Sequence, residues 1–303
     1  MKYITKFGLH IICNYLTKGD KKRLKELKEN PLIKTIKDIS YIDDNKREHL
    51  LDIHFPVKEI DNGITIIDIH GGGYMYGYKE NNFYFCQELA KKGFKVISVN
   101  YSLSNNKINV KDVIRELFTA INFIYENKNE FGVDMDNVCI MGDSAGGHFA
   151  LLFALALNYK EVRECLGIKF DIPMQINKVI TSSPVYDYSS LCEDMRKKAT
   201  KRALKFLAGK EALFDSNYPL ICCPRTWIKK IGDVNFEVFV STCKEDFLRE
   251  HPLLLKEDLK EKATIYDPIT ATKLEHIFPI VKPDTLEAKK CIELINEFIL
   301  KAL

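Results

Sequence analysis

The stretch that most constrains the fold of this chain spans residues 137–157 and reads NVCIMGDSAGGHFALLFALAL. Val138–Met141 form a short apolar run that is typical of a buried parallel strand. Phe149–Leu157 are apolar with small residues interleaved, as in a buried helix. A strand that turns directly into a helix leaves no room for side chains at Gly142 and Gly146. The pattern therefore predicts a tight strand-to-helix turn within a sheet-based fold.

Ser144 stands at the apex of this turn, in the pentapeptide GDSAG. Between a strand and a helix, G-x-S-x-G is typical of a turn that presents a nucleophilic serine at the edge of a sheet. The simpler alternative is a glycine-rich turn with a buried serine. A serine hydroxyl is a poor nucleophile at neutral pH, so the catalytic hypothesis requires a histidine base and a carboxylate elsewhere in the chain.

An aspartate and a histidine later in the chain occupy the positions that this chemistry requires. For a nucleophile at such a turn, the acid follows a later strand and the histidine comes after the acid. Asp246 comes shortly after the apolar run Phe236–Ser241, and His276 lies between the last strand-like run and the last helical pattern. We therefore predict a catalytic triad of Ser144, Asp246 and His276.

Other acids and histidines fit these roles less well. Glu245 neighbours Asp246 and stays an alternative acid, whereas Asp267 follows one strand too late. His148, four residues after the serine, is expected to pack or cap along the helix, and His251 is expected on a helix surface. The histidines of the amino-terminal region are expected in ordinary solvated or core positions: His10, His49 and His54.

A second glycine-rich motif, HGGGY, lies well before the serine and follows the apolar run at residues 64–69. Glycines allow backbone N–H groups to approach a ligand with no Cβ in the way. We predict that the N–H groups of Gly72, Gly73 and Ala145 stabilise the oxyanion that forms during acyl transfer. His70 is expected to order this loop rather than to transfer protons. The alternative for the motif is a flexible turn.

Strand-like and helix-like patterns alternate along most of the chain. An antiparallel strand pair is predicted at a sheet edge, at residues 36–41 and 48–55. Alternation of this kind implies an α/β fold, with a mostly parallel sheet covered by helices on both faces. Further strands are predicted at residues 64–69, 96–101, 138–141, 179–182, 236–241 and 263–266, and helices at residues 81–92, 110–127, 149–157 and 284–300.

The length of 303 residues suits one α/β domain with an insertion. Residues 186–234 contain no convincing strand and include a basic helical stretch at 195–207. We expect them to form a helical cap over the carboxyl edge of the sheet, where open α/β sheets bind ligands. Helical spacing in residues 1–33 predicts N-terminal helices that belong to the same cap. The catalytic domain is then residues 34–303, with the cap inserted.

Composition excludes several classes of protein. A net charge of +3, from 45 basic and 42 acidic residues, is too balanced for a nucleic-acid-binding protein. The longest apolar run, at residues 149–157, is too short to span a bilayer, and no signal peptide is recognised. The 9 cysteines show no C-x-x-C pair and no clustering with histidine, which argues against a disulfide framework and a zinc site. We expect reduced thiols, a cytoplasmic location and no metal.

HGGGY at residues 70–74, GDSAGG at 142–147, Asp246 and His276 together resemble the hormone-sensitive-lipase family of α/β-hydrolases, the esterases and lipases that carry HGGG. The resemblance covers about residues 34–303. It implies the α/β-hydrolase fold with a helical cap, and the triad and oxyanion groups predicted above. It also implies hydrolysis without a cofactor.

Two segments depart from the usual pattern of that family. YSLSNNKINV begins at Tyr101, where the family usually reads YRLAPE, and the acid lies in the sequence Asp246-Phe247-Leu248 instead of D-P-L. Neither change removes a reacting group. Both leave the class of substrate open.

The sequence as a whole predicts a serine hydrolase that cleaves small carboxylic esters of short or medium acyl chain through an acyl-serine intermediate. An amidase, a formamidase or a small-peptide hydrolase would use the same triad. A ligand-binding homologue without turnover would keep the pocket, and a lipase at a membrane surface would use the helix at residues 4–16 as its anchor. No nucleic acid and no stable membrane insertion are expected, and the sequence leaves a homodimer open.

Overall fold

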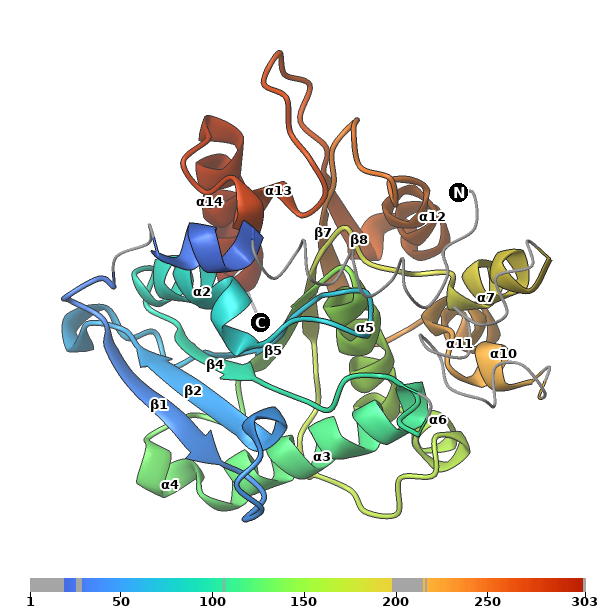
Figure 1. Cartoon of the computed structure of the whole chain (residues 1–303), viewed down its shortest axis with the longest axis horizontal. Helices are drawn as coiled ribbons and strands as arrows, with labels where there is room; N and C mark the ends of the chain where they lie inside the picture. The colour runs from blue at the N-terminus through green and yellow to red at the C-terminus, as the bar shows by residue number, and fades with distance from the viewer. Residues whose placement is uncertain (1–18, 26–28, 106, 198–214, 216, 302–303) are drawn as a thin grey trace.

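The computed structural model describes residues 19–25, 29–105, 107–197, 215 and 217–301. They contain an eight-stranded sheet with the strand order β1-β2-β4-β3-β5-β6-β7-β8 (Figure 1). β2 runs antiparallel to β1 and to β4, and every other pairing is parallel. The strands span Lys34–Ser40 (β1), Leu50–Phe55 (β2), Thr65–Ile69 (β3), Lys95–Val99 (β4), Val138–Asp143 (β5), Lys178–Ser182 (β6), Glu237–Ser241 (β7) and Ala263–Tyr266 (β8).

Helices cover both faces of this sheet (Figure 1). α3 and α5 contribute apolar side chains to a buried cluster on one face, and α2 and α14 contribute to a second cluster on the other face. The predicted α/β fold class is confirmed. The helices of this layer structure span Phe83–Ala90 (α2), Val110–Glu126 (α3), Lys128–Phe131 (α4), Ala145–Asn158 (α5), Lys160–Cys165 (α6), Glu250–Leu259 (α12), Phe278–Val281 (α13) and Leu286–Leu300 (α14). Short 3-10 turns lie at Arg47–His49, Lys58–Ile60, Lys79–Asn82 and Lys260–Lys262.

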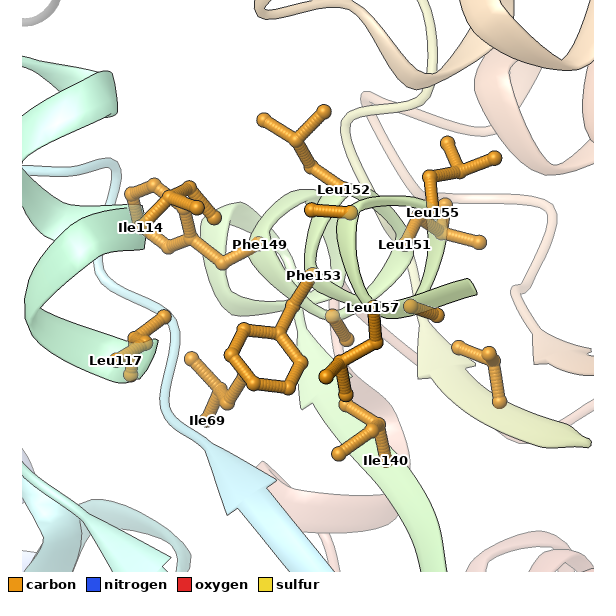
Figure 2. Close-up of a cluster of buried hydrophobic side chains, with 14 of the residues drawn as sticks. Ile69, Ile114, Leu117, Ile140, Phe149, Leu151, Leu152, Phe153, Leu155 and Leu157 are labelled. Atoms are coloured by element: carbon orange, nitrogen blue, oxygen red, sulfur yellow. The ribbon is translucent and has the colours of Figure 1, made fainter. Parts of the chain in front are cut away.

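α5 is the central helix, and its residues from Ala145 to Leu157 are all buried. Such a helix must be apolar on every side, which explains its run of alanine, leucine and phenylalanine. Figure 2 shows the ring of Phe149 beside Ile114 of α3 and the ring of Phe153 close to Ile69 of β3. The element that follows the serine is therefore fixed by packing from the neighbouring helix and from the sheet.

Most elements predicted from the sequence are present at the expected places. The antiparallel pair at residues 36–41 and 48–55 is confirmed as β1 and β2 at one edge. The helix expected from residue 81 begins later, because residues 79–82 form a 3-10 turn before α2. Asn109 explains the start of α3, since its side chain accepts hydrogen bonds from the N–H groups of Lys111 and Asp112 in a capping box.

The predicted insertion, residues 186–234, contains helices and no strand in its described part. Arg225 forms one ion pair within the insertion, with Asp187 (2.9 Å), and a second with Asp258 of α12 (2.8 Å) that ties the insertion to the body of the protein. Most of the basic helix expected at residues 195–207 lies outside the described residues. The role of the insertion as a cap stays a prediction. Its helices span Tyr188–Lys197 (α7), Tyr218–Ile221 (α10) and Pro224–Ile231 (α11).

Residues 19–25 form a helix that contacts α13 and the 3-10 turn before α2. The Arg23 guanidinium donates hydrogen bonds to the carbonyl oxygens of Ile280 (3.2 Å) and Asn81 (2.9 Å). Asp20 accepts a hydrogen bond from the hydroxyl of Tyr76, which follows the HGGGY motif. The rest of the predicted N-terminal helices lies outside the described residues, and their part in a cap stays a prediction.

Three findings concern the surroundings and cofactors of the protein. Every cysteine in the described ranges is a free thiol. Within the same ranges, no helix combines the length and apolar character needed to cross a membrane. The described side chains also include no group of three or more His, Cys, Asp or Glu that could hold a metal ion.

Candidate active site

Ser144 is held in a strained backbone conformation where β5 meets α5. Its φ of 51° and ψ of −116° lie in a region that residues with a Cβ rarely adopt. The Ser144 N–H donates to the carbonyl of Ser182 (2.8 Å) at the end of β6, and the Ser144 carbonyl accepts from the N–H groups of His148 and Val185 (3.2 Å each). The end of β6 and the first turn of α5 thus fix the serine at the carboxyl edge of the sheet.

The glycines on both sides of the serine allow the backbone segments to meet. A Cβ on Gly142 would lie 2.4 Å from the carbonyl oxygen of Gly146, and a Cβ on Gly146 would lie 2.0 Å from the carbonyl oxygen of Ile69. These neighbours are backbone atoms, which cannot rotate aside as a side chain would. The steric requirement for small residues at both positions, predicted from the sequence, is confirmed.

Replacing Gly146 with alanine should lower the free energy of unfolding by about 3 kcal/mol, because α5 would have to move away from the end of β3. Urea unfolding followed by circular dichroism measures this change. Gly19→Ala is the matched control, since no atom of the described residues lies within 4 Å of the added Cβ. It should change stability by less than about 0.5 kcal/mol. A Gly146→Ala protein as stable as the wild type would contradict the close packing of this turn.

The structure brings Ser144, His276 and Asp246 into one hydrogen-bonded line. The distance from His276 Nε2 to Ser144 Oγ is 2.8 Å, and the distance from His276 Nδ1 to Asp246 Oδ1 is also 2.8 Å. A carboxylate oxygen only accepts, so Nδ1 carries the proton and Nε2 is left to accept from the serine hydroxyl. Asp246 comes from the turn after β7 and His276 from the loop after β8, as the chain order of the motifs predicted.

Asp246 is buried and its carboxylate is fully hydrogen-bonded. Oδ1 also accepts from the N–H of Leu248 (2.9 Å), and Oδ2 accepts from the hydroxyl of Thr242 (3.1 Å). Burial raises the pKa of Asp246, but the hydrogen bond from His276 lowers it, and the net result is a pKa below the usual value. The group is therefore ionised at neutral pH and holds the imidazole in one orientation.

The alternative acids do not reach His276 in this arrangement. The side chain of Glu245 is exposed to solvent. Asp267 forms an ion pair with Arg249 instead. The geometry therefore favours Asp246 over both.

The other histidines of the described residues have partners outside the triad. His148 is buried, where Nε2 donates to the carbonyl of Cys222 (2.7 Å) and Nδ1 accepts from the hydroxyl of Tyr74 (3.1 Å), which is the packing role expected. The expectation of a surface position for His251 is wrong: it is half-buried, and its Nδ1 accepts from the N–H of Asp187 (3.0 Å). The inserted segment covers this end of α12, and periodicity along the helix did not reveal that neighbour. His49 and His54 are buried, and His10 lies outside the described residues.

The N–H groups expected to form an oxyanion hole are free of partners in the described part of the chain. No described residue accepts from the N–H of Gly72 or of Gly73. Ala145 is the first residue of α5, where an N–H has no partner within its own helix. Gly72 has φ 126°, and a Cβ there would lie 1.9 Å from the carbonyl oxygen of Tyr76, so this loop conformation requires glycine.

His70 orders the loop that carries these glycines. Its Nδ1 donates to the carbonyl of Gly71 (2.8 Å), and its ring stacks on Tyr101 with centroids 4.3 Å apart. The Tyr101 hydroxyl in turn donates to the carbonyl of His70 (2.6 Å). Burial lowers the pKa of His70 to about 4, so the imidazole is neutral at neutral pH. These contacts agree with the ordering role expected for His70.

Asp143 and Asn82 are site residues that the sequence analysis missed. Asp143 precedes the serine, and its Oδ1 accepts from the N–H of Gly71 (2.9 Å) and from Asn82 Nδ2 (2.8 Å). Asn82 also donates to both oxygens of Asp68 (3.2 Å each). Burial and the charge of Asp143 raise the pKa of Asp68 to about 8. The hydrogen bond from the Gly71 N–H to Asp143 joins the glycine loop to the turn that carries Ser144. Asp143 stood inside the pentapeptide, whereas no local pattern pointed to Asn82.

Comparison with known proteins finds that the chain is similar to esterases and related hydrolases. A protein of Acanthamoeba polyphaga mimivirus named as an alpha/beta hydrolase, R526, is 26% identical over 164 residues, which are 54% of this chain and 46% of that protein. The acetyl esterase of Salmonella paratyphi B is 30% identical over 100 residues, which are 33% of this chain and 31% of that protein. The chain thus matches less than half the length of either curated relative.

A solved structure extends the comparison to almost the whole chain. Esterase B from Lactobacillus rhamnosis, crystallised with a C4-C4 tributyrin phosphonate inhibitor, has a TM-score of 0.84 and 20% sequence identity, covering 98% of this chain and 96% of that chain. The α/β-hydrolase fold implied by the sequence motifs is confirmed. Residues 51–242, well over half of the sequence, match the BD-FAE family. The chain therefore belongs to the BD-FAE family, on an α/β-hydrolase fold.

Proposed function

We propose that this protein hydrolyses carboxylic esters of short or medium acyl chain through an acyl-serine intermediate. The observation that carries the proposal is the hydrogen-bonded line from Ser144 Oγ through His276 to Asp246, with 2.8 Å at each step. Ester hydrolysis by a nucleophilic serine needs a base within hydrogen-bond reach of the serine hydroxyl and a carboxylate that orients the base. Both requirements are met at the carboxyl edge of the sheet.

In the first half of the reaction, Ser144 Oγ attacks the carbonyl carbon of the ester while its proton passes to His276 Nε2. The imidazole becomes positively charged, and the ionised Asp246, hydrogen-bonded to Nδ1, stabilises that charge. When the C–O bond to the alcohol breaks, Nε2 returns the proton to the departing oxygen. The products of this half are a free alcohol and an acyl group on Ser144.

The negative charge on the carbonyl oxygen is proposed to lie against the N–H groups of Gly72, Gly73 and Ala145. Fixed backbone donors of this kind contribute about 3 kcal/mol each to the stability of the transition state. The absence of partners for the two loop N–H groups among the described residues supports this role. Asp143 and Asn82 are proposed as positioning residues, because they hold the loop in place through Gly71.

Water completes the cycle. His276 Nε2 removes a proton from a water molecule, the water oxygen attacks the acyl carbon, and the proton then passes to Ser144 Oγ as the carboxylic acid leaves. No metal or organic cofactor is required for these steps. The substrates are proposed to be small-molecule esters. The proposed location is the cytoplasm, and the free thiols of the described residues support that location.

The preference for short or medium acyl chains is supported by the relatives. One is named an acetyl esterase, and esterase B was crystallised with an inhibitor derived from tributyrin, an ester with four-carbon acyl chains. Amide hydrolysis on the same triad is the main alternative. No contact in the described site favours an amide over an ester.

A panel of p-nitrophenyl esters from acetate to palmitate, with matching aryl amides, tests this function. We expect kcat/KM to be highest between the two-carbon and eight-carbon acyl chains and to fall for longer chains. Aryl amides should react at least about a hundredfold more slowly, because an amine is a poorer leaving group than an alcohol. Addition of a chelator should leave the rates unchanged. A maximum at palmitate, or amides cleaved faster than esters, would contradict the proposal.

A further inference from the structure

The apolar side chain of Phe247 packs against His276, the proposed catalytic base, on its solvent side. Its ring centroid lies 4.3 Å from that of His276, and the two ring planes make an angle of 40°. Phe247 is nonetheless 76% exposed. The ring therefore covers part of His276 and turns most of its surface to solvent.

Hydrogen bonds and an ion pair hold the backbone on both sides of Phe247, which fixes the place of its ring. The preceding residue is Asp246, whose N–H donates to the carbonyl of Cys243 (3.1 Å) and whose Oδ1 accepts from the N–H of Leu248 (2.9 Å). Arg249, two residues further on, forms an ion pair with Asp267 at the end of β8. An aromatic ring that is exposed on a fixed turn costs little conformational entropy when a ligand covers it.

The chemistry of the proposed reaction decides which part of an ester this ring would meet. His276 Nε2 must hand its proton to the oxygen of the leaving alcohol, so the alcohol group lies beside the imidazole. The carbonyl oxygen of the ester points instead to the N–H groups of Gly72, Gly73 and Ala145. A side chain packed against His276 on the solvent side is therefore next to the alcohol group rather than to the acyl chain.

We infer that Phe247 is a specificity-determining residue that binds the alcohol portion of the ester and favours aromatic or bulky apolar alcohols. The inference rests on the ester hydrolysis proposed above. An aromatic alcohol would cover the exposed ring, gaining apolar burial and an offset or edge-to-face ring contact. A charged or very small alcohol would gain neither.

The test uses the full-length protein and acetate esters that differ only in the alcohol. In the Phe247→Ala variant, kcat/KM for benzyl acetate should fall about tenfold, mainly through a higher KM, while kcat/KM for ethyl acetate should change less than about twofold. Phe247→Tyr should restore the preference for benzyl acetate, because the aromatic face is kept. Ile269→Ala is the matched control, since Ile269 is fully exposed on the loop after β8 that also carries His276. It should leave both esters unaffected.

The outcomes separate this inference from the function on which it rests. Equal losses in kcat for both acetates would show that Phe247 acts through the position of His276, which overturns the specificity role. A loss that follows acyl length in ethyl acetate, butyrate and hexanoate would place the ring beside the acyl chain and overturn it as well. Unchanged kinetics of Phe247→Ala would also overturn it, while ester hydrolysis would stand. A wild-type protein that cleaves none of these esters would overturn the proposed function itself.

Discussion

Replacing Ser144 with alanine is expected to lower kcat for ester hydrolysis by about a million-fold. The variant lacks the atom proposed to form the acyl intermediate, so the proposed base His276 and its partner Asp246 would have no hydroxyl to activate. Only the oxyanion donors and substrate binding remain, which leaves a small rate above that of water. The measurement is the hydrolysis of p-nitrophenyl acetate by freshly purified protein, with circular dichroism to establish that the variant is folded.

A matched control and a chemical probe make the assignment of the nucleophile specific. Ser40→Ala, at the exposed end of β1, should keep wild-type activity. A fluorophosphonate should react with the wild-type protein at one serine, forming a bond from Ser144 Oγ to phosphorus as fluoride leaves. Near-wild-type turnover in a folded Ser144→Ala variant, or labelling at another serine, would relocate the site.

Replacing Asp246 with asparagine is expected to lower kcat by about ten thousand-fold, with little change in KM. The neutral amide cannot stabilise the imidazolium, and its NH₂ group favours the tautomer in which His276 Nδ1 accepts a hydrogen bond. Nε2 would then carry a proton and could not receive one from Ser144. Steady-state kinetics on p-nitrophenyl acetate measure both parameters.

Glu245→Gln provides the control, since Glu245 is the adjacent carboxylate and its side chain is exposed. It should keep activity within about twofold of the wild type, in line with the small effects of exposed substitutions. If Glu245→Gln lost more activity than Asp246→Asn, the orienting carboxylate would be Glu245, and the site geometry in solution would differ from the one described.

The fold was predictable because local patterns in the sequence indicated its strands and helices, and similar patterns pointed to the proposed reacting groups. Short apolar runs predicted the parallel strands, and the apolar stretch at residues 149–157 predicted a buried helix, which the structure shows as part of α5. Gly142 and Gly146 pointed to a close approach that the structure confirms at 2.4 Å and 2.0 Å. The proposed acid and base followed from their places after two late strands, since the strands of a parallel sheet deliver their carboxyl ends to one edge.

What escaped the sequence analysis depends on contacts between distant segments. Asn82 meets Asp143 at 2.8 Å across 61 positions of sequence, and no periodicity encodes such a pairing. His251 was misplaced because the segment that covers it comes from the insertion, through Asp187. Phe247 was visible only as a departure from D-P-L, and its contact with His276 required the path of two loops.

β8 lies at an edge of the sheet, so the part of the site that follows it is less well supported than the part between β5 and the buried α5. His276 reaches Ser144 from the loop after this four-residue strand, which closes the sheet at one edge, whereas the serine stands between β5 and the buried α5. Edge elements open locally at a lower free-energy cost than the whole domain needs to unfold. Local opening of this edge would separate His276, the proposed base, from Ser144, the proposed nucleophile, while the core stayed folded. On this arrangement, we expect substitutions that stabilise the β8 edge to preserve the proposed site more than substitutions that stabilise the core.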